Sequence, residues 1–253
     1  MNTTVQNLQI EYTDRGTGPV LLFLHGWAAP LAAYEPIFKV LERKYRVIAP
    51  QLPGSGASQE PDRPWKLEDY GAFVLEFCRT LEMTPEVLMG HSHGGRTSLW
   101  LLGNGKLNPH KCVLMDSAGI PAKKTAKQKL SLRFFKCCKW LGTNRLTAPF
   151  FGDLYRELRD KRSSADYRAA SPIMKGTLSN VIACDLRPLM PSVQTDTLLL
   201  WGDRDTATPL SDGQEMERLL PCAGLAVVKN AGHFPYVDNP AQFFAILGIY
   251  LEV

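Results

Sequence analysis

The segment GHSHGG at residues 90–95 carries the residue with the clearest chemical potential, Ser92. It contains the motif Gly90-x-Ser92-x-Gly94, which directly follows a short apolar run and precedes a helix-like segment. A serine on a sharp strand-to-helix turn projects its hydroxyl away from the sheet, and glycines on either side remove side chains that would collide there. The motif therefore predicts a serine nucleophile, and an ordinary glycine-rich turn is the alternative interpretation.

A serine hydroxyl needs a base near neutral pH, and that base needs an acid to orient it. AGHFPYVDNP supplies His233, and WGDRDTATP supplies Asp203 and Asp205. Both loops follow apolar runs that we interpret as strands, and open α/β sheets place their sites at the carboxyl ends of such strands. The chain order Ser92, Asp205, His233 is the one expected with this motif. Asp116, at the end of another apolar run, is a second candidate for the acid.

An oxyanion hole requires two hydrogen-bond donors about 3 Å from the developing charge. We expect the backbone N–H of His93, the residue after the serine, to be one donor and that of Trp27, in HGW after an apolar run, to be the other. His91 and His93 could suggest a metal, but residues two apart across a turn diverge and no third ligand is evident. We therefore predict no metal and expect both rings to pack, with a substrate-facing His93 as the alternative.

Short apolar runs alternate with segments of helical periodicity, which predicts an α/β fold with a mostly parallel sheet flanked by helices on both faces. VQNLQIEY at 5–12 alternates instead, as an antiparallel edge hairpin does. The other expected strands are 20–26, 45–50, 87–90, 111–116, 197–203 and 225–230. The expected helices are 31–43, 67–83, 95–104, 211–220 and 240–251.

Residues 120–190 break this alternation and read as a helical insertion between two parts of one core domain, 1–119 and 191–253. Within 120–170, Lys and Arg outnumber Asp and Glu by nine. Because the whole chain has a net charge of +4, the remainder carries −5. The basic character therefore belongs to the insertion.

The composition excludes several classes of protein. The chain has 253 residues, 45% of them hydrophobic, so it can bury a sizeable core and is not disordered. Its apolar runs are too short to span a bilayer and its first residues lack the pattern of a signal peptide, so we expect a cytoplasmic protein. Its six cysteines have no ordered spacing, which argues against a disulfide framework or a zinc site.

Taken together, LLFLHGW, RVIAPQLPGSGAS, GHSHGG, WGDRDTATP and AGHFPYVDNP resemble the motifs of the α/β-hydrolase superfamily, over nearly the whole chain. The resemblance implies that Ser92 is the nucleophile and His233 the base. In that family the acid usually stands third after a glycine, here Gly202, which selects Asp205 and leaves Asp203 as a loop-capping carboxylate. The insertion resembles the family's cap, which roofs the pocket.

We expect a serine hydrolase that cleaves carboxylic esters of small to medium acyl chains through an acyl-enzyme, without a cofactor. The same triad also suits hydrolysis of a C–C bond, a thioester or a lactone. A ligand-binding homologue of low turnover is an alternative from another functional class. The basic cap suggests a membrane-associated lipase as a further alternative. The expected partner is a small-molecule ester. We predict no nucleic-acid binding and no stable membrane insertion, with weak contact to an anionic surface through the cap.

Overall fold

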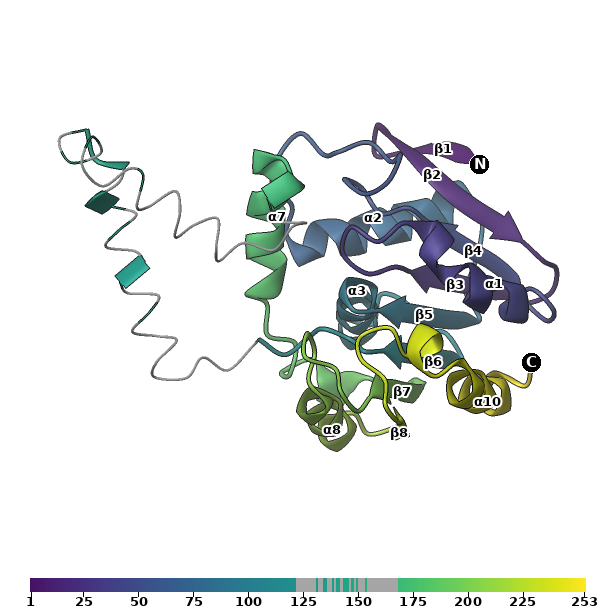
Figure 1. Ribbon diagram of the computed structural model, residues 1–253. Coiled ribbons are helices and arrows are strands. Elements are labelled where there is room, and N and C mark those ends of the chain that lie inside the picture. Colours follow the sequence, from purple (N-terminus) through teal and green to yellow (C-terminus); the bar gives the residue numbers. More distant parts are fainter. Residues whose placement is uncertain are drawn as a thin grey trace. The chain divides into compact units, whose positions relative to one another are not determined.

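Figure 1 shows the fold in a computed structural model. The structure describes residues 1–121 and 168–253 and, between them, positions 131, 134, 135, 138, 140, 141, 143, 144, 145, 147, 149 and 153. The chain divides into two compact units: Met1–Pro121 with Gly176–Val253, which we call the core unit, and Ala122–Lys175. Every site residue predicted above belongs to the core unit.

The second unit is shorter than the predicted insertion, 120–190, because residues 176–190 group with the core unit. Most of the basic segment, including 122–130 and 154–167, lies outside the described residues. The role of the insertion as a cap, and any contact of its lysines with an anionic surface, therefore stay predictions.

The core unit is built on an eight-stranded sheet with the order β1-β2-β4-β3-β5-β6-β7-β8. From β4 to β8 all neighbouring strands are parallel, whereas β2 is antiparallel to both β1 and β4. This arrangement confirms the predicted fold class. The strands are β1 (Asn2–Val5), β2 (Leu8–Arg15), β3 (Val20–Leu24), β4 (Arg46–Pro50), β5 (Val87–His91), β6 (Lys111–Met115), β7 (Asp196–Gly202) and β8 (Ala223–Val228).

The antiparallel edge is a hairpin whose loop consists of Gln6 and Asn7. Both residues have positive φ, 50° and 65°, which is the backbone twist that two-residue hairpin loops require. The predicted edge hairpin is therefore present, and it begins at Asn2 rather than at Val5.

Helices cover both faces of the sheet, as Figure 1 shows. Buried residues of α1 and α10 pack on one face, and those of α2, α3 and α8 pack on the other. Short helices η1, η2 and α9 lie in the connections. The helices are η1 (Leu31–Tyr34), α1 (Glu35–Leu41), α2 (Leu67–Thr80), α3 (His93–Gly103), α7 (Pro172–Ile182), η2 (Met190–Ser192), α8 (Leu210–Leu219), α9 (Pro235–Asp238) and α10 (Pro240–Leu251).

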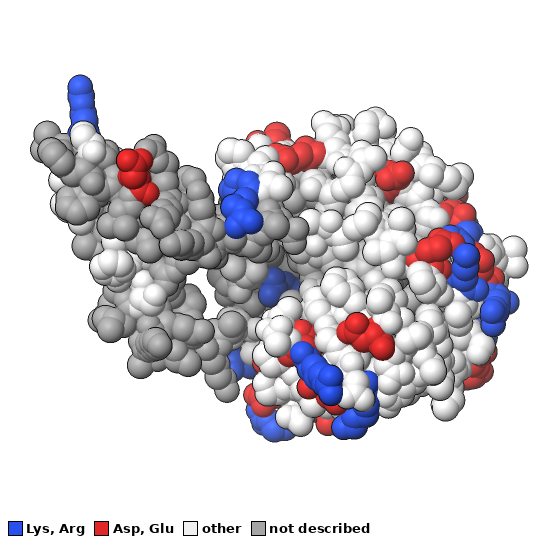
Figure 2. Space-filling view, in the orientation of Figure 1, with Lys and Arg blue, Asp and Glu red and all other residues white. Residues whose placement is uncertain are grey.

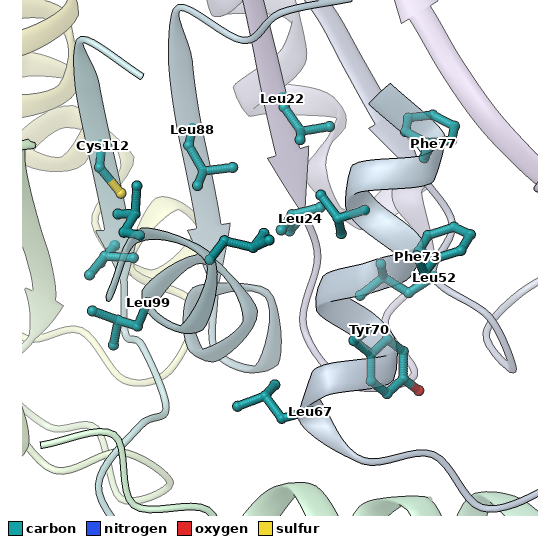
Figure 3. Packing of buried hydrophobic residues seen from close by; sticks show 14 of the residues in the cluster. Leu22, Leu24, Leu52, Leu67, Tyr70, Phe73, Phe77, Leu88, Leu99 and Cys112 are labelled. Carbon is teal, nitrogen blue, oxygen red and sulfur yellow. The ribbon is translucent and has the colours of Figure 1, made fainter. Parts of the chain in front are cut away.

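The alternation of side chains along each strand produces two separate cores. In β3, Leu22 and Leu24 join the cluster under α2 and α3, while Leu21 and Phe23 join the cluster under α1 and α10. Figure 3 shows part of the first cluster, where side chains of α2 meet Leu22 and Leu24. Since both faces of the central strands are buried, these strands are apolar runs without polar alternation.

On the face shown in Figure 2, described acidic and basic side chains of the core unit lie next to one another. The core unit contains ion pairs such as Arg46–Asp14 and Arg63–Asp69. Among the helices that the structure describes, none is long and apolar enough to cross a membrane.

Candidate active site

Ser92 lies at the sharp turn between β5 and α3. Its backbone has φ 51° and ψ −108°, a conformation that a non-glycine residue rarely adopts. A Cβ on Gly94 would lie 1.9 Å from the carbonyl oxygen of Leu24, and one on Gly90 would lie 2.7 Å from the backbone of Gly94. Both glycines of the motif therefore allow a close backbone approach that any other residue would prevent.

The strained turn is held by backbone hydrogen bonds to the neighbouring strand. The N–H of Ser92 donates to Met115 O at 3.1 Å, and its carbonyl accepts from Ala118 N and Arg96 N, both at 3.0 Å. These bonds join the turn to the end of β6 and to the first turn of α3. The surrounding structure thus stabilises a conformation that the isolated segment would avoid.

His233 and Asp205 meet on the loops that follow β8 and β7. His233 Nδ1 lies 2.7 Å from Asp205 Oδ2. The Asp205 carboxylate is fully buried, whereas 20% of the His233 side chain is exposed. An exposed imidazole held by a buried carboxylate is the arrangement of a base and its orienting acid. With Nδ1 donating to Asp205, Nε2 is the ring nitrogen left to accept a proton.

Several hydrogen bonds keep Asp205 ionised. Its Oδ1 accepts from Ala207 N at 2.7 Å and from Thr208 N at 3.1 Å, and its Oδ2 accepts from Thr208 Oγ1 at 2.7 Å. Burial by itself would raise the pKa of Asp205, but the bonds from His233 and Thr208 outweigh it and lower the pKa to about 2. Asp205 is therefore a carboxylate at neutral pH.

Asp116, the second candidate for the acid, differs in its protonation. Its Oδ1 accepts from Gly202 N at 2.9 Å, and its Oδ2 is enclosed without a hydrogen-bond partner among the described residues. Burial raises the pKa of Asp116 to about 9, and the neighbouring Asp205 adds to the rise. Asp116 is thus a neutral acid at neutral pH, next to the charged Asp205. The geometry favours Asp205 as the partner of His233.

Asp116, Asp205 and His233 each bring one possible ligand atom within 4.8 Å of the others, which is the layout of a metal cluster. The 2.7 Å contact between His233 Nδ1 and Asp205 Oδ2 gives two of these residues a hydrogen-bond partner without an ion. The absence of a catalytic metal stays a prediction. Asp203, the remaining acid of the loop, accepts from Ala231 N at 3.3 Å, in keeping with its expected loop-capping position.

His91 joins the serine turn to the histidine loop. Its Nε2 lies 2.8 Å from the backbone oxygen of His233, and its Nδ1 lies 2.7 Å from the hydroxyl of Tyr34. That hydroxyl also accepts from Gly26 N at 3.0 Å. Burial lowers the pKa of His91 to about 3, so the ring is neutral and donates from Nε2 to the carbonyl. His91 therefore packs, and it links the end of β5, just before Ser92, to the backbone of His233.

The backbone N–H groups of Trp27 and His93 have no acceptor within the described part of the chain. His93 is the first residue of α3, where N–H groups lack intrahelical partners. The loop of Trp27 is held by Ala29 N donating to Gly26 O at 3.1 Å and by His25, whose Nε2 accepts from Leu52 N at 2.8 Å. Both predicted oxyanion donors are therefore free to bind a ligand.

The side chain of His93 is enclosed by aromatic rings. Its ring centroid lies 4.7 Å from that of Tyr70 and 5.5 Å from that of Trp27, both edge-on. Burial lowers the pKa of His93 well below its usual value. The sequence reasoning missed Tyr34 and Thr208, which orient His91 and Asp205. The spacing from Asp205 to Thr208 is a signal for a side-chain-to-backbone turn, whereas nothing near Tyr34 indicates its partner.

A mostly parallel sheet with a strained serine turn after β5 and an acid–histidine pair after β7 and β8 defines an α/β-hydrolase fold. Residues 21–246 match the alpha/beta hydrolase family, so the chain belongs to that family.

Similar proteins differ in the bond they cleave. The pimeloyl-[acyl-carrier protein] methyl ester esterase of Aeromonas hydrophila is 27% identical over 92% of this chain and 95% of its own length. The 3-oxoadipate enol-lactonase 2 of Acinetobacter baylyi is 22% identical over 95% and 92%, respectively. The crystal structure of a bacterial membrane phospholipase A superposes with a TM-score of 0.75 at 25% identity, covering 100% of this chain and 85% of the other.

Proposed function

We propose that the chain hydrolyses carboxylic esters of small to medium acyl chain length, with Ser92, His233 and Asp205 as nucleophile, base and acid. The observation that carries the proposal is the 2.7 Å contact between His233 Nδ1 and Asp205 Oδ2, on loops adjacent to a serine at a strained turn. A buried carboxylate that orients a partly exposed imidazole has little purpose in a purely structural loop.

In the proposed reaction, Nε2 of His233 accepts the hydroxyl proton of Ser92 while Oγ attacks the ester carbonyl carbon. The negative charge that develops on the carbonyl oxygen is bound by the backbone N–H groups of Trp27 and His93. The imidazolium, stabilised by Asp205, then gives its proton to the leaving alcohol. The resulting acyl-enzyme is hydrolysed by water, which His233 activates in the same way. The proposed reaction requires no cofactor.

The comparisons support this choice of bond. One near full-length relative is named for the hydrolysis of a methyl ester, and the other for the opening of a lactone, which is a cyclic ester. Both reactions proceed by attack on an ester carbonyl. An ester substrate is therefore the simplest common chemistry for this chain.

The test is a chain-length series of 4-nitrophenyl esters together with labelling by a fluorophosphonate probe. We expect turnover of short and medium esters and labelling at Ser92, and we expect both to disappear in Ser92→Ala. Ser98→Ala is the matched control, because it removes a serine hydroxyl from the adjoining helix α3, one that bonds to Gly94 O at 2.9 Å. Equal activity of wild type and Ser92→Ala would refute the proposal.

Lactone opening is the second candidate, and the relative named as an enol-lactonase favours it. The two functions differ in which substrates give high kcat/KM. Labelling of Ser92 with efficient opening of lactones and poor turnover of open-chain esters would assign the chain to lactones. Labelling without turnover of either class would direct the search to thioesters and C–C bonds. No labelling at all would favour a ligand-binding homologue.

A further inference from the structure

Arg96 is buried one helical turn beyond the serine. It is the fourth residue of α3, and only 6% of its surface is exposed. An arginine at this depth needs a partner, because an uncompensated guanidinium in a protein interior costs several kcal/mol even after relaxation of its surroundings.

No such partner lies among the residues that the structure describes. Arg96 Nε is enclosed without a hydrogen bond, and the guanidinium forms no ion pair within the described residues. Burial lowers the pKa of Arg96 to about 10, so the side chain remains a cation at neutral pH. Several other arginines that the structure describes are more exposed and form ion pairs with carboxylates: Arg15, Arg46, Arg63, Arg79, Arg187 and Arg218. Among the residues that the structure describes, Arg96 is thus a deeply buried cation without a counter-charge.

A second buried polar side chain lies on the same face of the helix. His93 precedes Arg96 by three residues, a spacing that brings side chains together on a helix surface. Both ring nitrogens of His93 are enclosed and have no hydrogen-bond partner in the described part of the chain. The charge on Arg96 also acts on the His93 ring and helps to lower its pKa.

This face of α3 adjoins the proposed oxyanion hole. The His93 ring lies edge-on to the ring of Trp27, whose backbone N–H is one of the two proposed donors. Along the helix axis, Ser92 and Arg96 are separated by about 6 Å, at about 1.5 Å per residue. A ligand that reaches both residues needs an anionic group a short chain away from its reacting carbonyl.

We propose that Arg96, with His93 beside it, binds a carboxylate carried by the substrate, so that the preferred esters are monoesters of short dicarboxylic acids. This inference rests on the proposed ester hydrolysis. A carboxylate fits because it accepts two parallel hydrogen bonds from a planar guanidinium and supplies the missing negative charge. It also gives the neutral imidazole of His93 an acceptor for its N–H.

The test compares monoethyl glutarate with diethyl glutarate, which has the same acyl chain but no charge, by measuring the release of ethanol. Charge-assisted hydrogen bonds contribute roughly 1.5–3 kcal/mol, so we expect kcat/KM for the monoester to exceed that for the diester by about 10- to 100-fold. Arg96→Met, which replaces the cation by an apolar side chain of similar length, should reduce this ratio to about one or below.

Arg79→Met is the matched control, because Arg79 is an exposed arginine of α2 whose partner is Glu76. It should leave the ratio unchanged. A wild-type ratio of one or less, or a ratio that survives Arg96→Met, would overturn the inference. If Arg96→Met does not fold, Arg96→Lys replaces it, since a point charge loses the two-bond geometry and should give an intermediate ratio. An unchanged ratio in Arg96→Lys would then count against the proposal.

A binding measurement separates this inference from the function on which it rests. If no ester is hydrolysed and the fluorophosphonate does not label Ser92, the proposed function fails. The melting temperature with and without glutarate then decides the carboxylate site. A rise in wild type that is absent in Arg96→Met supports the site, and no rise in wild type overturns it.

Discussion

Replacing Asp116 by asparagine should make the protein more stable at neutral pH, because Asp116 is a buried acid that must hold its proton. Burial raises its pKa from 3.8 to about 9. Between these values the folded chain binds a proton that the unfolded chain has released, so stability falls as the pH rises. The loss is about 1.4 kcal/mol per pH unit, which gives an upper limit of about 4 kcal/mol at pH 7.

Asparagine is nearly isosteric with the protonated acid. Its Oδ1 can accept from Gly202 N as Asp116 does, and its amide brings no negative charge next to Asp205 at any pH. Asp116→Asn should therefore keep the site intact and remove only the pH-dependent loss of stability. We expect its advantage over wild type to be absent near pH 4 and to grow steadily up to pH 9.

The assay is urea unfolding at pH 5, 7 and 8.5, with ester turnover measured on the same preparations. Turnover of Asp116→Asn should stay within about fivefold of wild type, because the free energy of one neutral hydrogen bond corresponds to a rate factor of about that size. Asp205→Asn is the contrasting variant, and it should lower kcat by about 10⁴-fold, as expected when a triad acid becomes an amide. The reasoning is refuted if the stability difference does not change with pH, or if the two variants lose similar activity.

Three further outcomes follow from the packing around the serine turn. Gly94→Ala should lower the free energy of unfolding, measured with urea, by more than about 3 kcal/mol, because its Cβ would lie 1.9 Å from a backbone oxygen. Gly224→Ala is the control and should cost less than about 1 kcal/mol, because a Cβ there would lie in open space. Tyr34→Phe should cost about 1–3 kcal/mol in the same assay, since it leaves a buried N–H and a buried ring nitrogen without a partner. In Asp116→Asn, which removes the opposing titration of Asp116, acid should destabilise the fold as the pH falls below 6.5, because His25 and His91 have their pKa lowered to about 4 and 3 and stay neutral while the unfolded chain takes up protons. Unchanged melting temperatures of this variant between pH 7 and 5 would contradict this.

The sheet could be predicted from the sequence because its central strands are buried on both faces. Such strands are short apolar runs, and all six that were expected after the edge hairpin are present. The first of them, expected at 20–26, ends at Leu24 because His25 and Gly26 turn away into the loop of Trp27. Hydrophobicity alone does not mark the residue at which the backbone leaves the sheet.

The acid and histidine loops could be located by motif, but the protonation of their neighbours could not. Asp116 and Asp205 are both aspartates at strand ends, and the sequence offers no reason for one to be neutral and the other charged. The difference depends on how many N–H and O–H groups point at each carboxylate in three dimensions. The burial of Arg96 was also unexpected, because arginine is rarely found inside a protein.

The hydrogen bond between His91 and the loop of His233 determines when the conformational entropy of that loop is lost. The loop is bound through the main-chain oxygen of His233, not through its imidazole. The backbone that carries the base is therefore positioned when the chain folds, and the contact of Nδ1 with Asp205 Oδ2 orients the ring. The entropy of bringing base and nucleophile together is thus lost once in the life of each molecule and not again in every turnover.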